Sequence, residues 1–119
     1  MTKGIQQYLD LPAKELLEKF GEGRHVPGSG SAAALSALLA TELMITVCKL
    51  TQRKEGYSRV HKDFEYIQNQ IETVYKPKLI DLFNNDIVVF GEVSDIRMRR
   101  DAEVSAVENV SYPFWQRKN

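Results

Sequence analysis

The stretch that decides the fold is residues 26–51, which read VPGSGSAAALSALLATELMITVCKLT. From Ser31 to Arg53 the chain is rich in alanine, leucine, methionine and glutamate, which favour helix strongly, so the sequence predicts one long helix. Small residues recur with helical spacing on one face, and larger apolar residues widen the apolar surface beside them. A helix that is apolar on so many sides belongs in the centre of a bundle or at a subunit interface.

A glycine-rich loop precedes this helix. Residues 21–30 read GEGRHVPGSG and include four glycines and one proline, a composition that rules out regular structure. Ser29 or Ser31 can then cap the N-terminus of the long helix, because a serine hydroxyl accepts a hydrogen bond from a free backbone N–H.

Shorter helical patterns lie on both sides of the long helix. They cover residues 11–20, 60–74, 78–93 and 95–110, and Pro77 is expected to end or kink the third helix of the chain. The length of 119 residues is that of one ordinary domain. The sequence therefore predicts a single all-α domain, residues 1–119, built as an up-and-down bundle of about five helices.

Composition narrows the function. Sixteen basic residues balance sixteen acidic ones, so no basic surface favours nucleic acid or an anionic membrane. Polar residues interrupt the longest apolar stretch, which argues against a membrane span. The single cysteine, Cys48, excludes an internal disulfide, and the two histidines have no neighbours at metal-ligand spacing. We therefore expect a cytoplasmic protein without a metal.

The glycine-rich loop is the first candidate site. Residues Pro27, Gly28, Ser29, Gly30 and Ser31 lead into a helix N-terminus, where free N–H groups and the helix dipole can hold a carboxylate or phosphate. The alternative is a hinge between two packed helices.

Three charged residues on helices are further candidates. Asp86 lies four residues from both Leu82 and Phe90, so it shares the apolar stripe of its helix. A carboxylate facing a core needs a partner and is a candidate acid/base or ligand-binding group, unless it lies at the rim with a neighbour. Glu42 and Lys49 lie on one side of the long helix, where they either line a polar cleft or form a solvated stripe.

The segment from Val26 to Leu35, continued to Lys49-Leu50-Thr51, resembles the opening of the formiminotransferase-cyclodeaminase C-terminal family, which includes the methenyltetrahydrofolate cyclohydrolases. The hallmark of that family is a Pro-Gly-Gly-Gly-Ser loop, an alanine-rich helix and a Leu-Thr at the end of the helix. Here Ser29 replaces the middle glycine. Asp86, with Phe90 four residues later, resembles the aspartate-aromatic helix of the family. The chain is shorter than the usual family domain, so we expect a short or truncated member.

The resemblance implies an all-α homodimer that binds a tetrahydrofolate derivative in a cleft between helices. It implies either elimination of ammonia from 5-formiminotetrahydrofolate with ring closure, or hydrolysis of 5,10-methenyltetrahydrofolate. Asp86 would then be the catalytic residue, and Pro27 to Ser31, with Glu42 and Lys49, would bind the substrate. The alternative is a non-catalytic helical module for dimerisation or protein interaction that kept the fold and lost the activity.

Overall fold

A computed structural model describes the backbone of residues 7–111 and the side chains of residues 7–107. A short 3-10 helix, η1 (Tyr8–Asp10), precedes α1 (Ala13–Phe20) and the long α2 (Ser29–Gln52). A second 3-10 stretch, η2 (Glu55–Val60), leads into α3 (His61–Gln70), a π-helical turn η3 (Ile71–Tyr75) and α4 (Lys76–Ser111). The described residues contain helices and no strands, so the predicted all-α class is confirmed.

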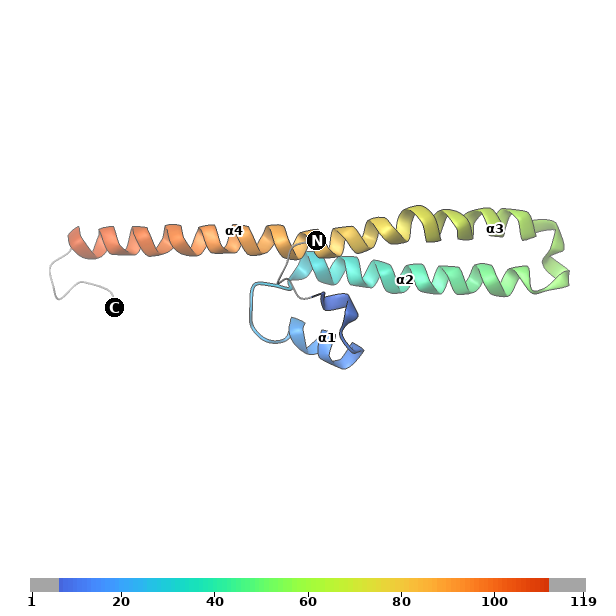
Figure 1. Ribbon diagram of the computed structural model, residues 1–119, viewed down its shortest axis with the longest axis horizontal. Coiled ribbons are helices and arrows are strands. Elements are labelled where there is room, and N and C mark those ends of the chain that lie inside the picture. Colours follow the sequence, from blue (N-terminus) through green and yellow to red (C-terminus); the bar gives the residue numbers. More distant parts are fainter. Residues whose placement is uncertain (1–6, 112–119) are drawn as a thin grey trace.

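The central element is a helical hairpin. The long helix α2 runs back along α3 and the first part of α4 (Figure 1). Its buried residues are spaced by alternating steps of three and four, as in a helix–helix seam, and they are Ser31, Ala34, Leu38, Thr41, Ile45 and Cys48. The position of α2 at the centre of the fold therefore follows from its sequence, as does its start just after the glycine-rich loop.

The number of helices differs from the prediction. The three helices expected after residue 60 form one continuous rod, α3–η3–α4, so the described chain holds three helices rather than about five. Pro77 does not end the rod, although it lacks an N–H and its ring clashes with the preceding turn. It is the second residue of α4, directly after the π-helical turn, so the regular hydrogen-bond pattern is already interrupted where Pro77 would break it.

The best-formed core lies where α1 folds back against the N-terminal end of α2. Its buried members come from three helices and are Leu16, Ala34, Phe83 and Ile87. Side chains of η1, α1 and the glycine-rich loop pack around them, together with one more from α2, and these are Tyr8, Leu9, Leu11, Phe20, Val26 and Leu35. This cluster packs the N-terminal part of α2 against the first third of α4.

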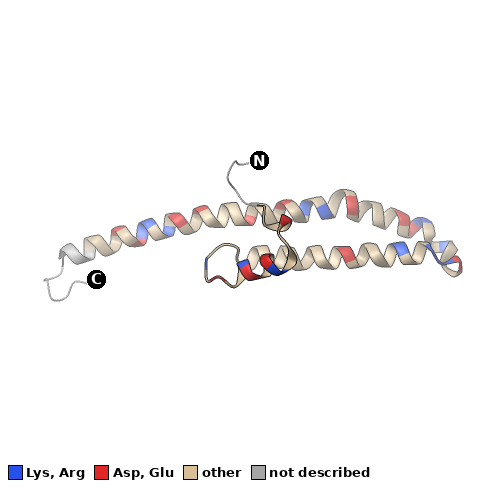
Figure 2. Cartoon of the chain, turned by 60° about the horizontal axis from the view of Figure 1, so that its bottom comes forward, with Lys and Arg blue, Asp and Glu red and all other residues tan. Residues whose placement is uncertain are grey.

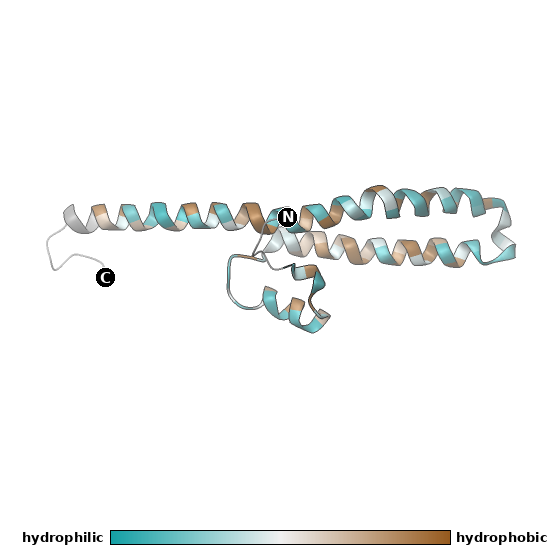
Figure 3. Cartoon of the chain, in the orientation of Figure 1, coloured by the Kyte–Doolittle hydropathy of each residue, from teal (hydrophilic) through white to brown (hydrophobic). Residues whose placement is uncertain are grey.

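The molecule is elongated. Its radius of gyration is 22.7 Å, whereas a compact chain of this length has about 13–14 Å. The cause is α4, whose second half continues past the start of α2 without another helix of the chain beside it (Figure 1). We call residues 92–111 the arm. Charges of both signs are scattered along the arm and the hairpin (Figure 2), whereas α2 carries long apolar stretches (Figure 3).

One described helix, α2, meets the length and composition expected of a membrane span. The central helix of a folded domain meets the same criterion, and 22% of the apolar window is buried inside the molecule. Glu42 and Lys49 interrupt the apolar surface of α2, and Glu42 forms an ion pair with Lys76.

Candidate functional site

Two residues that are far apart in the sequence meet at the start of α2. The Ser31 hydroxyl, in the first turn of α2, donates a hydrogen bond to Asp86 Oδ2 on α4 at 3.0 Å. Ser31 is fully buried, and Asp86 is half-buried. The glycine-rich loop and the aspartate of the apolar stripe therefore lie together, as two parts of one site.

Gly30 makes this meeting possible because it has no side chain. A Cβ added at Gly30 would lie 2.6 Å from Asp86 Cγ and 2.7 Å from Asp86 Oδ2, and it would also collide with Oδ1. Real Cβ atoms do not approach other atoms this closely. The carboxylate of Asp86 therefore lies directly over the backbone of Gly30, in space that any other residue would fill.

The electrostatics of the site differ from the expectation for an anion-binding loop. The N-terminus of α2 carries the positive end of the helix dipole, which favours a negative group within the first turn. The carboxylate of Asp86 already lies there, beside Gly30 and Ser31. A second anion would meet a like charge at this point, whereas a cation or an N–H donor would be attracted.

The surroundings hold Asp86 in a defined place. Phe83 and Ile87 lie one turn before and one residue after it, and both are buried in the core formed with α1. Pro27 is also buried and follows Val26 through a cis peptide bond. Gly28 is the N-cap of α2 in extended backbone, and Ser29 and Gly30 are exposed. The buried side chains of Phe83, Ile87 and Pro27 thus form the apolar base of the site, and the site is exposed to solvent at Ser29 and Gly30.

Neither serine caps α2 through its side chain as the sequence predicted. The N-cap position belongs to Gly28, and no side-chain hydrogen bond is made there. The Ser31 hydroxyl instead donates a hydrogen bond to Asp86 Oδ2. Ser31 therefore positions the acid.

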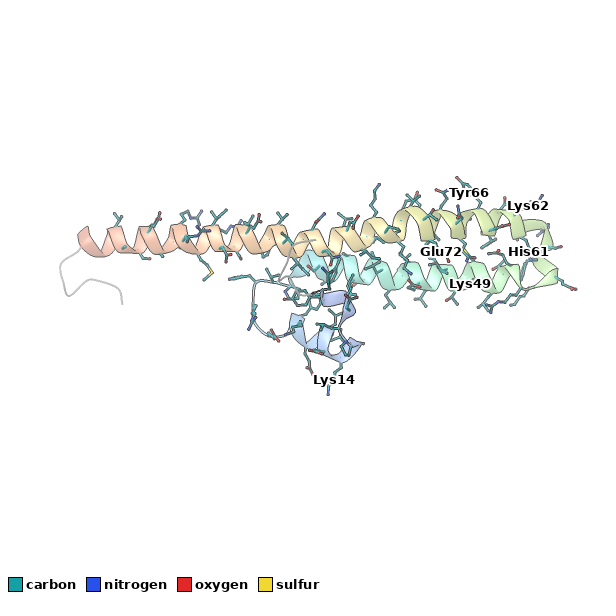
Figure 4. All side chains as sticks on the ribbon, in the orientation of Figure 1. Lys14, Lys49, His61, Lys62, Tyr66 and Glu72 are labelled. Atoms are coloured by element: carbon teal, nitrogen blue, oxygen red, sulfur yellow. The ribbon has the colours of Figure 1, made fainter. Side chains whose placement is uncertain are left out.

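Glu42 and Lys49 lie away from Asp86 in this chain. They follow Gly30 by 12 and 19 residues in α2, which is ~18 Å and ~28 Å along a helix. Glu42 pairs with Lys76, and Lys49 lies toward the end of the hairpin where α2 turns back (Figure 4). The structure therefore brings Pro27 to Ser31 and Asp86 together, and it does not bring Glu42 or Lys49 to them.

An apolar groove that sequence reasoning missed lies beside the π-helical turn. It encloses about 520 Å³ between α2 and the α3–η3–α4 rod, and it is lined by Thr41, Met44, Tyr66, Ile67, Gln70, Ile71, Tyr75 and Leu79. Neither Ser31 nor Asp86 lines it. The only sequence signal near it is Pro77, and that signal predicted a helix break.

The chain matches the model of a known protein family. The family model for formiminotransferase-cyclodeaminase matches residues 12–109, which is most of the chain and includes both the glycine-rich loop and Asp86. Searches of curated proteins and of solved structures found no match. The family match covers α1, α2, α3 and nearly all of α4, so the contact between Ser31 and Asp86 lies inside it. The chain therefore belongs to the formiminotransferase-cyclodeaminase family.

Proposed function

We propose that the chain binds a tetrahydrofolate derivative that carries a formimino or methenyl group, with that group placed against Asp86. The observation that supports this most strongly is the contact of Asp86 with Ser31 and Gly30. It joins two segments inside the family match, and it places a carboxylate at the N-terminal end of α2, where Ser29 and Gly30 are exposed to solvent.

The charge of the site favours this group over a free anion. A methenyl bridge and a protonated formimino group are cationic, and a carboxylate attracts a cation strongly where water is partly excluded. Asp86 is half-buried above an apolar base, so its interaction with a cation is screened less than at an open surface. The glutamate carboxylate of a folate would then lie away from Asp86.

The proposed chemistry is proton transfer by Asp86. In ring closure, N10 of the folate attacks the formimino carbon and the amino group leaves as ammonia. Asp86 would accept the proton from N10 and return it to the leaving nitrogen. In hydrolysis of the methenyl group, Asp86 would accept a proton from the attacking water. A positioned carboxylate contributes to either reaction as a general acid and base, typically 10²–10⁴-fold.

The hydrogen bond from Ser31 supports this role. It holds one oxygen of Asp86, Oδ2. The other oxygen, Oδ1, lies over the exposed Gly30 and would meet the substrate there. Because Ser31 is completely buried, its hydroxyl does not exchange this partner for water. A preorganised carboxylate loses less free energy on reaching the transition state than a mobile one.

Calorimetric titration of the intact chain with 5,10-methenyltetrahydrofolate, followed by a turnover assay, tests the proposal. We expect Asp86→Asn to weaken binding at least tenfold and to abolish turnover while circular dichroism shows unchanged helix content. The matched control is Asp81→Asn, which removes an exposed carboxylate from the same helix and should leave both unchanged. Equal affinity and rate in the Asp86→Asn protein would contradict the proposal.

The remaining expectations stay predictions. Glu42 or Lys49 could bind the substrate only through a part of the folate that extends along α2, away from the group held at Asp86. A cytoplasmic location and a homodimer are expected from the sequence and the family resemblance.

A further inference from the structure

The end of the hairpin, where α2 turns back into α3, holds a concentration of basic side chains (Figure 2). Residues 49–63 include five basic residues against two acidic ones, whereas the rest of the chain has 11 basic against 14 acidic. The five are Lys49, Arg53, Lys54, Arg59 and Lys62. The expectation of no anionic membrane partner was drawn from the balanced total charge, and that total conceals this local excess. We call residues 49–63 the basic tip.

The five cations of the basic tip are available to a partner. Each of them is exposed, and none forms an ion pair with another residue in the described part of the chain. Lys49 on α2 and Lys62 on α3 both lie near this end of the hairpin (Figure 4). Lys54 Nζ lies 6.0 Å from the centroid of the Tyr57 ring, and that ring carries no charge that would neutralise it.

The helix dipoles account for only part of this charge. Lys49, Arg53 and Lys54 lie in or just after the last turn of α2, where the negative end of the dipole attracts cations. Lys62 lies in the first turn of α3, and Arg59 comes two residues before that helix begins. At this end of a helix the dipole favours acids. Because Arg59 and Lys62 oppose the electrostatics of the fold, they point to an anionic partner outside the chain.

Apolar side chains are exposed among these cations. Tyr57 is 50% exposed, Leu50 48% and Val47 55%. They border a groove of about 460 Å³ whose walls are mainly apolar and include Val60 and Phe64. Exposed aromatic and aliphatic side chains beside cations are typical of protein surfaces that bind at the membrane–water interface. A nucleic acid would attract the cations equally well, but its phosphate backbone gives the aliphatic side chains no apolar partner.

We propose that the basic tip docks end-on against a membrane surface that contains anionic phospholipids. The five cations face the lipid phosphates and carboxylates, and Tyr57 and Leu50 enter the headgroup layer. The two interactions act together, because one such signal alone gives only marginal, reversible membrane binding. The 24 residues of α2 separate the basic tip from the Asp86 site by ~35 Å, so this proposal does not rest on the folate proposal.

Sedimentation of the intact chain with lipid vesicles tests the proposal. We expect at least tenfold tighter binding to vesicles of phosphatidylcholine and phosphatidylserine in a two-to-one ratio than to vesicles of phosphatidylcholine alone. Arg59→Gln combined with Lys62→Gln should lower the affinity for the mixed vesicles at least tenfold, because each cation near an anionic surface contributes about fivefold. High salt should weaken the binding of the unaltered protein, because it screens these charges.

Two further variants separate the basic tip from charge in general. Arg97→Gln combined with Arg99→Gln is the matched control, because it removes two exposed arginines from the arm and changes the net charge equally. It should leave vesicle binding unchanged within about twofold. Tyr57→Ser keeps the charge and should weaken binding at least threefold. Circular dichroism should show the same helix content in every variant, since each replaced residue is exposed.

Four results would overturn the proposal. The first is that the unaltered protein does not sediment with the mixed vesicles. The second is an equal loss of binding in the two paired variants, and the third is an unchanged affinity of the Tyr57→Ser protein. The fourth is tighter binding of a single-stranded oligonucleotide than of mixed vesicles at the same salt concentration, measured by fluorescence anisotropy, which would assign the basic tip to nucleic acid instead.

Discussion

Gly30→Ala is the change whose effect can be worked out most fully from the structure. The new methyl carbon would lie 2.6 Å from Asp86 Cγ, so the carboxylate must move by about 1 Å to reach ordinary van der Waals contact. The hydrogen bond from Ser31 to Asp86 is 3.0 Å long, and such a shift breaks it. Ser31 is completely buried, so its hydroxyl would lose its partner without gaining water.

Two opposing terms set the stability of the Gly30→Ala protein. Leaving a buried hydroxyl without a partner costs about 1–3 kcal/mol. Replacing glycine by alanine within a helix stabilises by up to about 1 kcal/mol. We therefore expect a net loss of 0 to about 3 kcal/mol in the free energy of unfolding, measured by urea denaturation. We expect a larger effect on folate affinity, at least tenfold, because Asp86 is displaced.

A double-mutant cycle separates the collision from other effects. In an Asp86→Ala background the methyl group added at position 30 has room, so Gly30→Ala should stabilise the protein there by up to about 1 kcal/mol. Gly56→Ala is a control, because a Cβ at Gly56 meets nothing within 4 Å. If Gly30→Ala has the same effect with and without Asp86, the close contact is not what requires glycine at this position.

Other predictions concern the core, the surface and the rod. Phe83 is 0% exposed, so Phe83→Ala should lower the free energy of unfolding by about 3–5 kcal/mol, measured by urea denaturation, and a loss below about 1 kcal/mol would contradict the core described here. Glu42→Gln breaks the pair with Lys76, but both side chains are more than one-third exposed, so the same measurement should change by less than about 1 kcal/mol and less still in high salt. Pro77→Ala should leave the helix content measured by circular dichroism unchanged or higher, because the rod is already continuous through this position; a loss of helix would show that the π-helical turn depends on proline.

The sequence predicted the centre of the fold well because its signals there are local. The glycine-rich loop and the helix formers after it set the start of α2 within two residues. The spacing around Asp86 placed it on the apolar stripe of its helix, and it left open whether the carboxylate faces the core or lies at the rim with a neighbouring side chain. The number of helices was wrong because Pro77 is a strong local signal against helix. A π-helical turn before Pro77 allows the helix to continue through the proline. Whether that turn forms depends on how the rod packs against α2, and no local sequence pattern reveals this packing.

The candidate site was predicted only in part, for a similar reason. Spacing identified Pro27 to Ser31 and Asp86 separately, but their contact joins residues that are 55 positions apart. The close contact between the Gly30 backbone and the carboxylate of Asp86 depends on how α2 and α4 pack together, so it cannot be predicted from local sequence. The anion expected at the start of α2 is supplied by the protein itself, and this changes the expected ligand group from an anion to a cation.

The central claim is that a formimino- or methenyl-type folate binds at Asp86, and backbone amide NMR of the intact, nitrogen-15-labelled chain tests it most directly. On titration with 5,10-methenyltetrahydrofolate we expect the signals of Gly28 and Gly30 to shift and saturate together, while that of Gly56 stays in place. In the Asp86→Asn protein these shifts should be lost. Shifts confined to the groove beside Met44 and Tyr66, or no saturable shift at all, would contradict the account.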